Sequence, residues 1–230
     1  MTGFAEPAVV DRQAVPAFPP PGVRVVVFDV VGTLVEPTPS VAEAYRSAAA
    51  GHGVLVEPAE IQRRFRAAWR RQEAVDAAST PAFATNRDRE ARRWRAIVDD
   101  VFTGVGQAEA IFVDLWRHFG TVEAWGPIDR GRDLVRAALD AGAMVALASN
   151  FDERLLSIAR VMEPLSWVPH VFPSSEIGWR KPAPEFFRVL EERLGCRPEE
   201  TLLVGDDPEL DIRAARRAGW RTLGVGAASG

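Results

Sequence analysis

The chain has 230 residues, of which 47% are hydrophobic and 26% charged, a composition typical of a globular protein. Its net charge of -4 argues against nucleic acid as a partner, and no apolar run approaches the length of a membrane span. The single cysteine, Cys196, cannot form an internal disulfide, and residues 1–22 lack the pattern of a signal peptide. Both features favour a cytoplasmic protein. We expect residues 1–22 to form a disordered tail, and no feature of the sequence indicates an oligomeric state.

Five short apolar runs predict the strands of a parallel sheet. They cover residues 23–31, 143–149, 170–174, 201–205 and 221–225. The runs are apolar almost throughout rather than alternating, as in strands that are covered on both faces. Helical patterns alternate with the later strands, at 128–141, 152–163, 183–194 and 208–218. The pattern predicts an α/β fold with a Rossmann-like, doubly wound parallel sheet.

The segment between the first two predicted strands has a different pattern. It holds no convincing strand, and amphipathic helices are expected at 40–51, 58–78, 87–103 and 107–119. This pattern predicts an α-helical cap domain inserted into the sheet domain. We place the cap at 37–125 and the α/β core domain at 23–36 and 126–230.

Polar side chains stand where the predicted strands end. Asp29 follows the first strand, Ser149 and Asn150 close the second, and Asp206 follows the fourth. In open parallel sheets, ligands bind beyond the carboxyl ends of the strands. We therefore expect these side chains to line one site.

A helix that begins at Pro208 would add a further carboxylate. Asp207 is suited to cap this helix, and Asp211 would then lie about one turn in, near enough to share a cation with Asp206. Hard divalent cations such as Mg²⁺ bind carboxylate oxygens together with a substrate phosphate. Asp29 and Asp206, at neighbouring strand ends, are the expected first ligands.

The basic residues of the chain contain one unusual member. Of 28 lysines and arginines, Lys181 is the only lysine, and it lies shortly after the third predicted strand. A compact ammonium group can contact a phosphoryl oxygen and a carboxylate together, unlike the wider guanidinium fork. Trp179, two residues earlier, is a candidate for the substrate entrance.

Four motifs, taken in chain order, resemble those of the haloacid dehalogenase superfamily of hydrolases. They are Asp29 with Gly32-Thr33, then Ser149, then Lys181-Pro182, and finally Gly205-Asp206 with Asp211. The helical insertion between the first and second motifs likewise resembles the cap that many members carry.

This resemblance implies a Mg²⁺-dependent phosphatase acting on a small phosphorylated molecule. Asp29 would attack phosphorus to give an aspartyl-phosphate, which water then hydrolyses. The implied catalytic residues are Asp29, Thr33, Ser149, Asn150 and Lys181. The implied metal ligands are Asp29, the backbone carbonyl of Val31, Asp206 and Asp211.

One position departs from the pattern of the family. Phosphatases of this kind usually carry a second aspartate two residues after the nucleophile, as general acid and base, and here that residue is Val31. A general acid-base group contributes about 10²–10⁴ in rate, so its loss predicts a slow enzyme or one limited to good leaving groups. Asp152, Glu36 and Asp207 are candidates to replace it, although Asp152 also suits the N-cap of the helix beginning at Glu153.

Two alternative functions remain open. The chain can be a binding or regulatory protein that keeps the fold and Mg²⁺ without useful turnover, as Val31 permits. It can also be a 2-haloacid dehalogenase, but those relatives replace the metal-binding acids that this chain keeps. The dehalogenase therefore ranks below the phosphatase.

Overall fold

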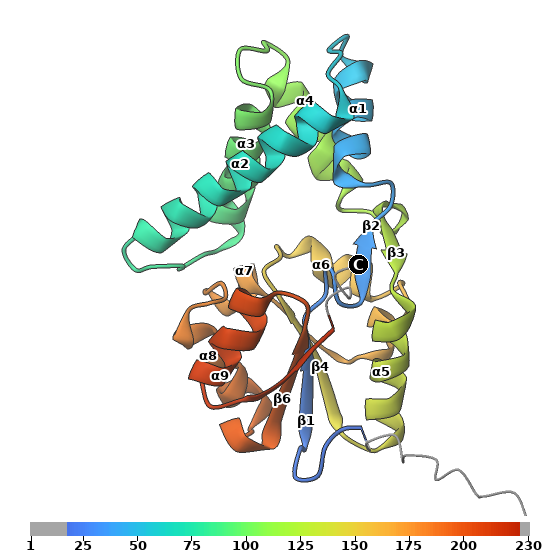
Figure 1. Cartoon of the computed structure of the whole chain (residues 1–230), viewed down its shortest axis with the longest axis vertical. Helices are drawn as coiled ribbons and strands as arrows, with labels where there is room; N and C mark the ends of the chain where they lie inside the picture. Colours follow the sequence, from blue (N-terminus) through green and yellow to red (C-terminus); the bar gives the residue numbers. More distant parts are fainter. Residues whose placement is uncertain (1–17, 226–230) are drawn as a thin grey trace, which may run out of the picture.

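The computed structural model describes residues 18–225, so most of the expected N-terminal tail lies outside the described residues. A five-stranded parallel sheet forms its centre, in the order β5-β4-β1-β6-β7 (Figure 1). The strands are β1 (Val25–Phe28), β4 (Met144–Ser149), β5 (His170–Pro173), β6 (Thr201–Gly205) and β7 (Arg221–Gly224). The predicted α/β fold with a parallel sheet is confirmed.

Helices cover both faces of this sheet. The α5 (Asp129–Asp140) and α6 (Arg154–Ala159) helices share an apolar core with Val26 and Phe28 of β1. On the opposite face, α8 (Pro184–Leu194) and α9 (Ala214–Arg217) share a second core with Val25 and Val27. Because successive side chains of a strand point to opposite faces, β1 must be apolar at every position.

Four helices inserted after β1 lie beyond the carboxyl ends of the strands (Figure 1). They are α1 (Val41–Gly51), α2 (Pro58–Ala78), α3 (Arg87–Val101) and α4 (Ala108–His118). Side-chain caps define the starts of α1 and α3, since Ser40 accepts from the amide of Glu43, and Asn86 from that of Arg89. The helices pack around an apolar core of their own, which includes Tyr45, Ile61, Ile97, Phe102 and Ile111.

A short antiparallel pair of strands joins this helical region to the sheet. The β2 strand (Val35–Pro37) pairs with β3 (Trp125–Pro127), and the pair stands at both junctions that we placed between core and cap. No strand was predicted there, because three residues that include a proline carry no strand periodicity.

The remaining elements are short, and some differ from the predicted bounds. The predicted helix 208–218 is a π-helical segment, η4 (Pro208–Arg213), followed by α9, and the predicted helix 152–163 is shorter, with α6 ending at Ala159. A four-residue helix and three 3₁₀ turns complete the described chain: α7 (Ser174–Ile177), η1 (Val122–Ala124), η2 (Leu165–Trp167) and η3 (Pro198–Glu200). Within residues 18–225, no helix has the length and apolar character needed to cross a membrane.

Candidate active site

The three adjacent central strands, β4, β1 and β6, end in polar side chains that contact one another or a shared partner. Ser149 closes β4 and donates a hydrogen bond from Oγ to Oδ1 of Asp29, just beyond β1, at 3.1 Å. Thr33 donates from Oγ1 to Oδ1 of Asp206, which follows β6, at 3.0 Å. The structure therefore brings these strand-end groups to one edge of the sheet, as the order of the strands requires.

Lys181 connects the nucleophile candidate to the second acidic motif. Its Nζ lies 2.6 Å from Oδ1 of Asp29 and 2.5 Å from Oδ1 of Asp211, and its side chain is 2% exposed. Asn150 holds the main chain of Lys181 from both sides, since Nδ2 donates to the carbonyl at 3.0 Å and Oδ1 accepts from the amide at 2.8 Å. Asn150 thus positions the lysine, a role that its place beside Ser149 did not reveal.

Three carboxylates form a group that can hold a cation. Asp29, Asp206 and Asp211 each offer an oxygen atom, and these atoms lie within 4.8 Å of one another. Two glycines permit this approach: a Cβ on Gly32 would lie 2.4 Å from Oδ2 of Asp206, and one on Gly205 would lie 2.4 Å from Oδ2 of Asp211. The set consists of hard oxygen ligands, which fits Mg²⁺.

The electrostatics of the site favour a cation. Burial raises the pKa of Asp29 to about 7, although Lys181 opposes the shift. Burial also raises the pKa of the half-buried Asp206. Burial acts against the ammonium of Lys181, yet Asp211 and Asp29 raise its pKa above the ordinary value. Three carboxylates share one ammonium group, so a divalent cation would relieve the excess of negative charge.

Two further acidic candidates have partners of their own. Oδ1 of Asp207 accepts from the amides of Glu209 and Leu210, at 2.7 and 2.9 Å, and so caps η4. The buried carboxylate of Asp152 is bound by the guanidinium of Arg154, at 2.7 and 2.6 Å. Both acids are held in structural interactions, which argues against either as the replacement for the absent general acid.

The other sequence candidates contribute no side chain to the acidic cluster. Glu36 is exposed on β2. Trp179 is not among the residues that line the large cavity described below, and it pairs through its backbone with Ala84, between α2 and α3. A role for Trp179 at the substrate entrance stays a prediction. Val31 is half-buried, and its side chain lines that cavity.

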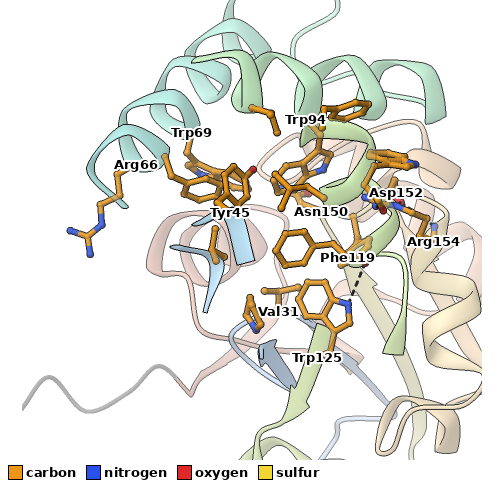
Figure 2. A pocket seen from close by; sticks show the side chains of 18 of the residues that line it. Val31, Tyr45, Arg66, Trp69, Trp94, Phe119, Trp125, Asn150, Asp152 and Arg154 are labelled. Carbon is orange, nitrogen blue, oxygen red and sulfur yellow. Dashed lines mark hydrogen bonds and ion pairs between the residues drawn. The ribbon is translucent and has the colours of Figure 1, made fainter. Parts of the chain in front are cut away.

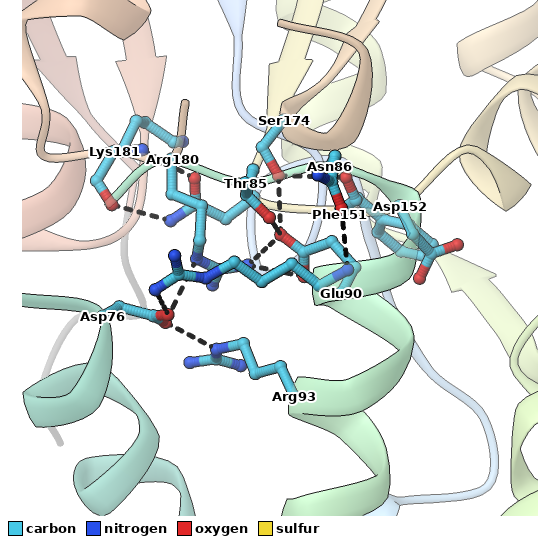
Figure 3. Close-up of polar contacts among 12 residues, drawn as sticks. Asp76, Thr85, Asn86, Glu90, Arg93, Phe151, Asp152, Ser174, Arg180 and Lys181 are labelled. Carbon is cyan, nitrogen blue, oxygen red and sulfur yellow. Dashed lines mark hydrogen bonds and ion pairs between the residues drawn. The ribbon is translucent and has the colours of Figure 1, made fainter. Parts of the chain in front are cut away.

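A buried arginine, not predicted from the sequence, joins the inserted helices to the loop that carries Lys181 (Figure 3). Arg180 is 1% exposed, and its Nη1 lies 2.7 and 2.8 Å from the two carboxylate oxygens of Glu90 on α3. The backbone amide of Arg180 also donates to the carbonyl of Phe83 at 2.9 Å. In a chain this rich in arginine, only the adjacency to Lys181 could have marked this residue.

More charged groups surround this contact. Asp76 of α2 accepts from Arg93 at 2.8 Å and from Arg89 at 3.2 Å, while Arg180 lies 3.7 Å from it. Glu73 binds Arg93 at 2.5 Å. We call the six residues the cap latch: Glu73, Asp76, Arg89, Glu90, Arg93 and Arg180.

A cavity of about 460 Å³ lies between the inserted helices and the sheet (Figure 2). Nine of its nineteen lining residues are aromatic, and the lining comes from all four helices of the insertion and from the core. Trp69, Trp94 and Trp116, which we interpreted as cap core, do pack against that core, but they also line the cavity. Val31 and Asn150 form the part of the wall next to the acidic cluster.

The chain is similar to known proteins over most of its length. The human haloacid dehalogenase-like hydrolase domain-containing protein 3 is 30% identical over 207 residues, which cover 87% of this chain and 81% of that protein. The L-2-haloacid dehalogenase of Xanthobacter autotrophicus superposes with a TM-score of 0.68 at 22% identity, over 90% of this chain and 79% of that one. The HAD-hydrolase YfnB of Bacillus subtilis, bound to magnesium, superposes with a TM-score of 0.64 at 20% identity, over 87% of both chains.

The family model for haloacid dehalogenase-like hydrolases matches residues 23–219. This range contains strands β1, β4, β5 and β6, the inserted helices and every member of the acidic cluster. The chain therefore belongs to the haloacid dehalogenase-like hydrolase family.

Proposed function

We propose that the protein is a Mg²⁺-dependent phosphatase that acts on a small phosphorylated molecule through an aspartyl-phosphate on Asp29. The observation that carries the proposal is the acidic cluster of Asp29, Asp206 and Asp211, with the Lys181 ammonium in contact with two of its members. A nucleophilic carboxylate beside further metal-binding acids suits an anionic phosphoryl group, which needs positive charge around it. The bound magnesium of the YfnB structure supports the choice of metal.

The contacts of Asp29 indicate which of its oxygens attacks. Ser149 and Lys181 both donate to Oδ1, which leaves Oδ2 for phosphorus. The bond from Oδ2 to phosphorus forms as the bond to the leaving oxygen breaks, and that oxygen keeps the electron pair. Water then attacks phosphorus and loses a proton to solvent, the Oδ2–phosphorus bond breaks with its electron pair on Asp29, and inorganic phosphate leaves. Mg²⁺ held by Asp29, Asp206 and Asp211 would supply positive charge to the phosphoryl oxygens.

Val31 narrows the choice of substrate. An alkyl phosphate needs a proton on its leaving oxygen, and the residue two positions after Asp29 has no proton to give. Asp152, one of the candidate replacements, is paired with Arg154. The leaving group of an acyl phosphate is a carboxylate and that of an aryl phosphate is a phenolate, and both can leave with little protonation. We therefore propose a preference for these two classes.

Hydrolysis assays test the proposal directly. We expect turnover of acetyl phosphate and p-nitrophenyl phosphate that requires Mg²⁺ and is lost with EDTA. Asp29→Asn should abolish turnover, whereas Asp133→Asn, on the exposed face of α5, should not change it. Undiminished activity in Asp29→Asn, or in the presence of EDTA, would contradict the proposal.

A second candidate function follows from the same departure at Val31. A protein with this cluster but without a proton donor can bind a phosphorylated ligand without turning it over. Mg²⁺-dependent binding of a stable phosphonate, with no hydrolysis of either test substrate, would favour this alternative. Release of halide from a 2-haloacid without Mg²⁺ would instead favour dehalogenase chemistry.

A further inference from the structure

The aromatic cavity adjoins the active site at two lining residues. Its wall includes Val31, two residues after Asp29, and Asn150, which follows Ser149. The organic part of a substrate whose phosphorus lies at Asp29 can extend past these two residues into the cavity. In a phosphatase with Asp in place of Val31, the leaving group would meet a carboxylate here, but in this chain it meets an apolar wall.

The lining of the cavity indicates an uncharged ligand group. Among the charged lining residues, Asp152 and Arg154 neutralise each other. Arg66 and Arg70 are exposed on α2, and Figure 2 shows the Arg66 guanidinium directed away from the aromatic rings. Away from the exposed Arg66 and Arg70, a charged group in this cavity would lose its hydration without gaining a partner, whereas an uncharged apolar group gains free energy by leaving water.

The aromatic side chains also indicate the shape of the ligand. Trp69, Trp94 and Trp125 are only half-buried, although they lie between the inserted helices and the core, because part of each ring faces the cavity. Aromatic rings pack well against other rings in offset or edge-to-face arrangements. A volume of about 460 Å³ lies within the range of about 300–1,000 Å³ typical of small-molecule pockets. An acetyl group would leave most of it empty.

We propose that this cavity is the leaving-group subsite and that it selects phosphates with an uncharged aromatic group, such as benzoyl phosphate or 1-naphthyl phosphate. The assignment of a leaving group rests on the proposed phosphatase function. With benzoyl phosphate, the Oδ2–phosphorus bond forms at Asp29 as the phosphorus–oxygen bond to benzoate breaks. Benzoate departs with the electron pair and needs no proton, which fits the apolar Val31.

Acyl phosphates of different size provide the kinetic test. Acetyl and benzoyl phosphate have leaving groups of similar acidity, so their rates report mainly on contacts of the ring. We expect kcat/KM for benzoyl phosphate to exceed that for acetyl phosphate at least about tenfold. Trp94→Leu should reduce this ratio, whereas Trp167→Leu, which makes the same change outside the cavity lining, should preserve it. Equal kcat/KM values for the two substrates would overturn the proposal.

A binding measurement separates this inference from the proposed activity. Naphthalen-1-ylmethylphosphonate and methylphosphonate carry a phosphorus–carbon bond that the enzyme cannot hydrolyse in this way. By calorimetry with Mg²⁺ present, we expect the wild-type protein to bind the naphthyl compound at least about tenfold more tightly. Tight binding of the naphthyl compound, without hydrolysis of any phosphate, would refute the phosphatase activity but support a preference for aromatic ligands. Equal affinities, with hydrolysis intact, would refute the aromatic subsite alone.

Discussion

Replacement of Arg180 by methionine should destabilise the protein strongly, because it leaves a buried charge without its partner. The Glu90 carboxylate is 0% exposed, and Arg180 approaches it at 2.7 and 2.8 Å. Without the guanidinium, the donors to Oε1 of Glu90 that remain are the hydroxyls of Thr85 at 2.9 Å and Ser174 at 3.3 Å. Breaking a buried ion pair in this way costs about 3–5 kcal/mol.

The rest of the cap latch retains its own pairs in this variant. Asp76 still has Arg89 and Arg93, so the cost is concentrated on Glu90. A double variant, Arg180→Met with Glu90→Gln, removes the stranded charge and should recover much of the lost stability. Urea unfolding at pH 7 measures both effects, through a midpoint that falls in the single variant and partly returns in the double variant.

An exposed pair of the same type provides the control. Arg188 and Glu192 form an ion pair on the surface of α8, at 2.7 Å, with both side chains well exposed. Arg188→Met should lower the midpoint far less, because water replaces the lost contact. A loss in Arg180→Met no larger than in Arg188→Met, or a double variant no more stable than the single one, would refute this account of the latch.

Three further substitutions test the site. Val31→Asp adds a general acid, so the rate of hydrolysis of an alkyl phosphate should rise by at least about 10²-fold in steady-state assays. An unchanged rate in a folded variant would show that the absence of this acid does not limit the rate. Lys181→Met leaves the carboxylates of the cluster without their ammonium, so the Mg²⁺-free variant should have a lower Tm than the Mg²⁺-free wild type. Mg²⁺ should then raise the Tm of the variant by more than it raises that of the wild type. Equal increases in Tm would contradict the charge argument. Gly205→Ala places a Cβ 2.4 Å from a carboxylate oxygen of Asp211, so the Mg²⁺ affinity measured by calorimetry should fall about 10–100-fold. Gly106→Ala adds a Cβ in open space and should bind Mg²⁺ like the wild type.

The sheet and the convergence of the site could be predicted because both follow from local patterns. Strands covered on both faces must be apolar at successive positions, so β1, β4 and β6 were visible as runs. The edge where parallel strands end then determines which polar residues meet. Asp29, Ser149 and Asp206 could be brought together from their positions alone.

The features that were not predicted depend on contacts between distant segments. The pairing of Arg180 with Glu90 joins residues 90 positions apart, and neither residue type marks such a contact. The part that Asp152 plays depends on the side-chain direction of Arg154. The tryptophans of the inserted helices show helical spacing, but only the packed structure reveals that Trp69 and Trp94 also face a cavity.

The central claim is that Asp29 accepts a phosphoryl group with the help of Mg²⁺ bound among the neighbouring acids. Fluorine NMR of the protein with beryllium fluoride, which imitates a phosphoryl group on a carboxylate, measures this directly. We predict a bound fluorine resonance that requires Mg²⁺, disappears in Asp29→Asn and persists in Asp133→Asn. A resonance that forms equally well without Mg²⁺, or that survives in Asp29→Asn, would contradict the claim.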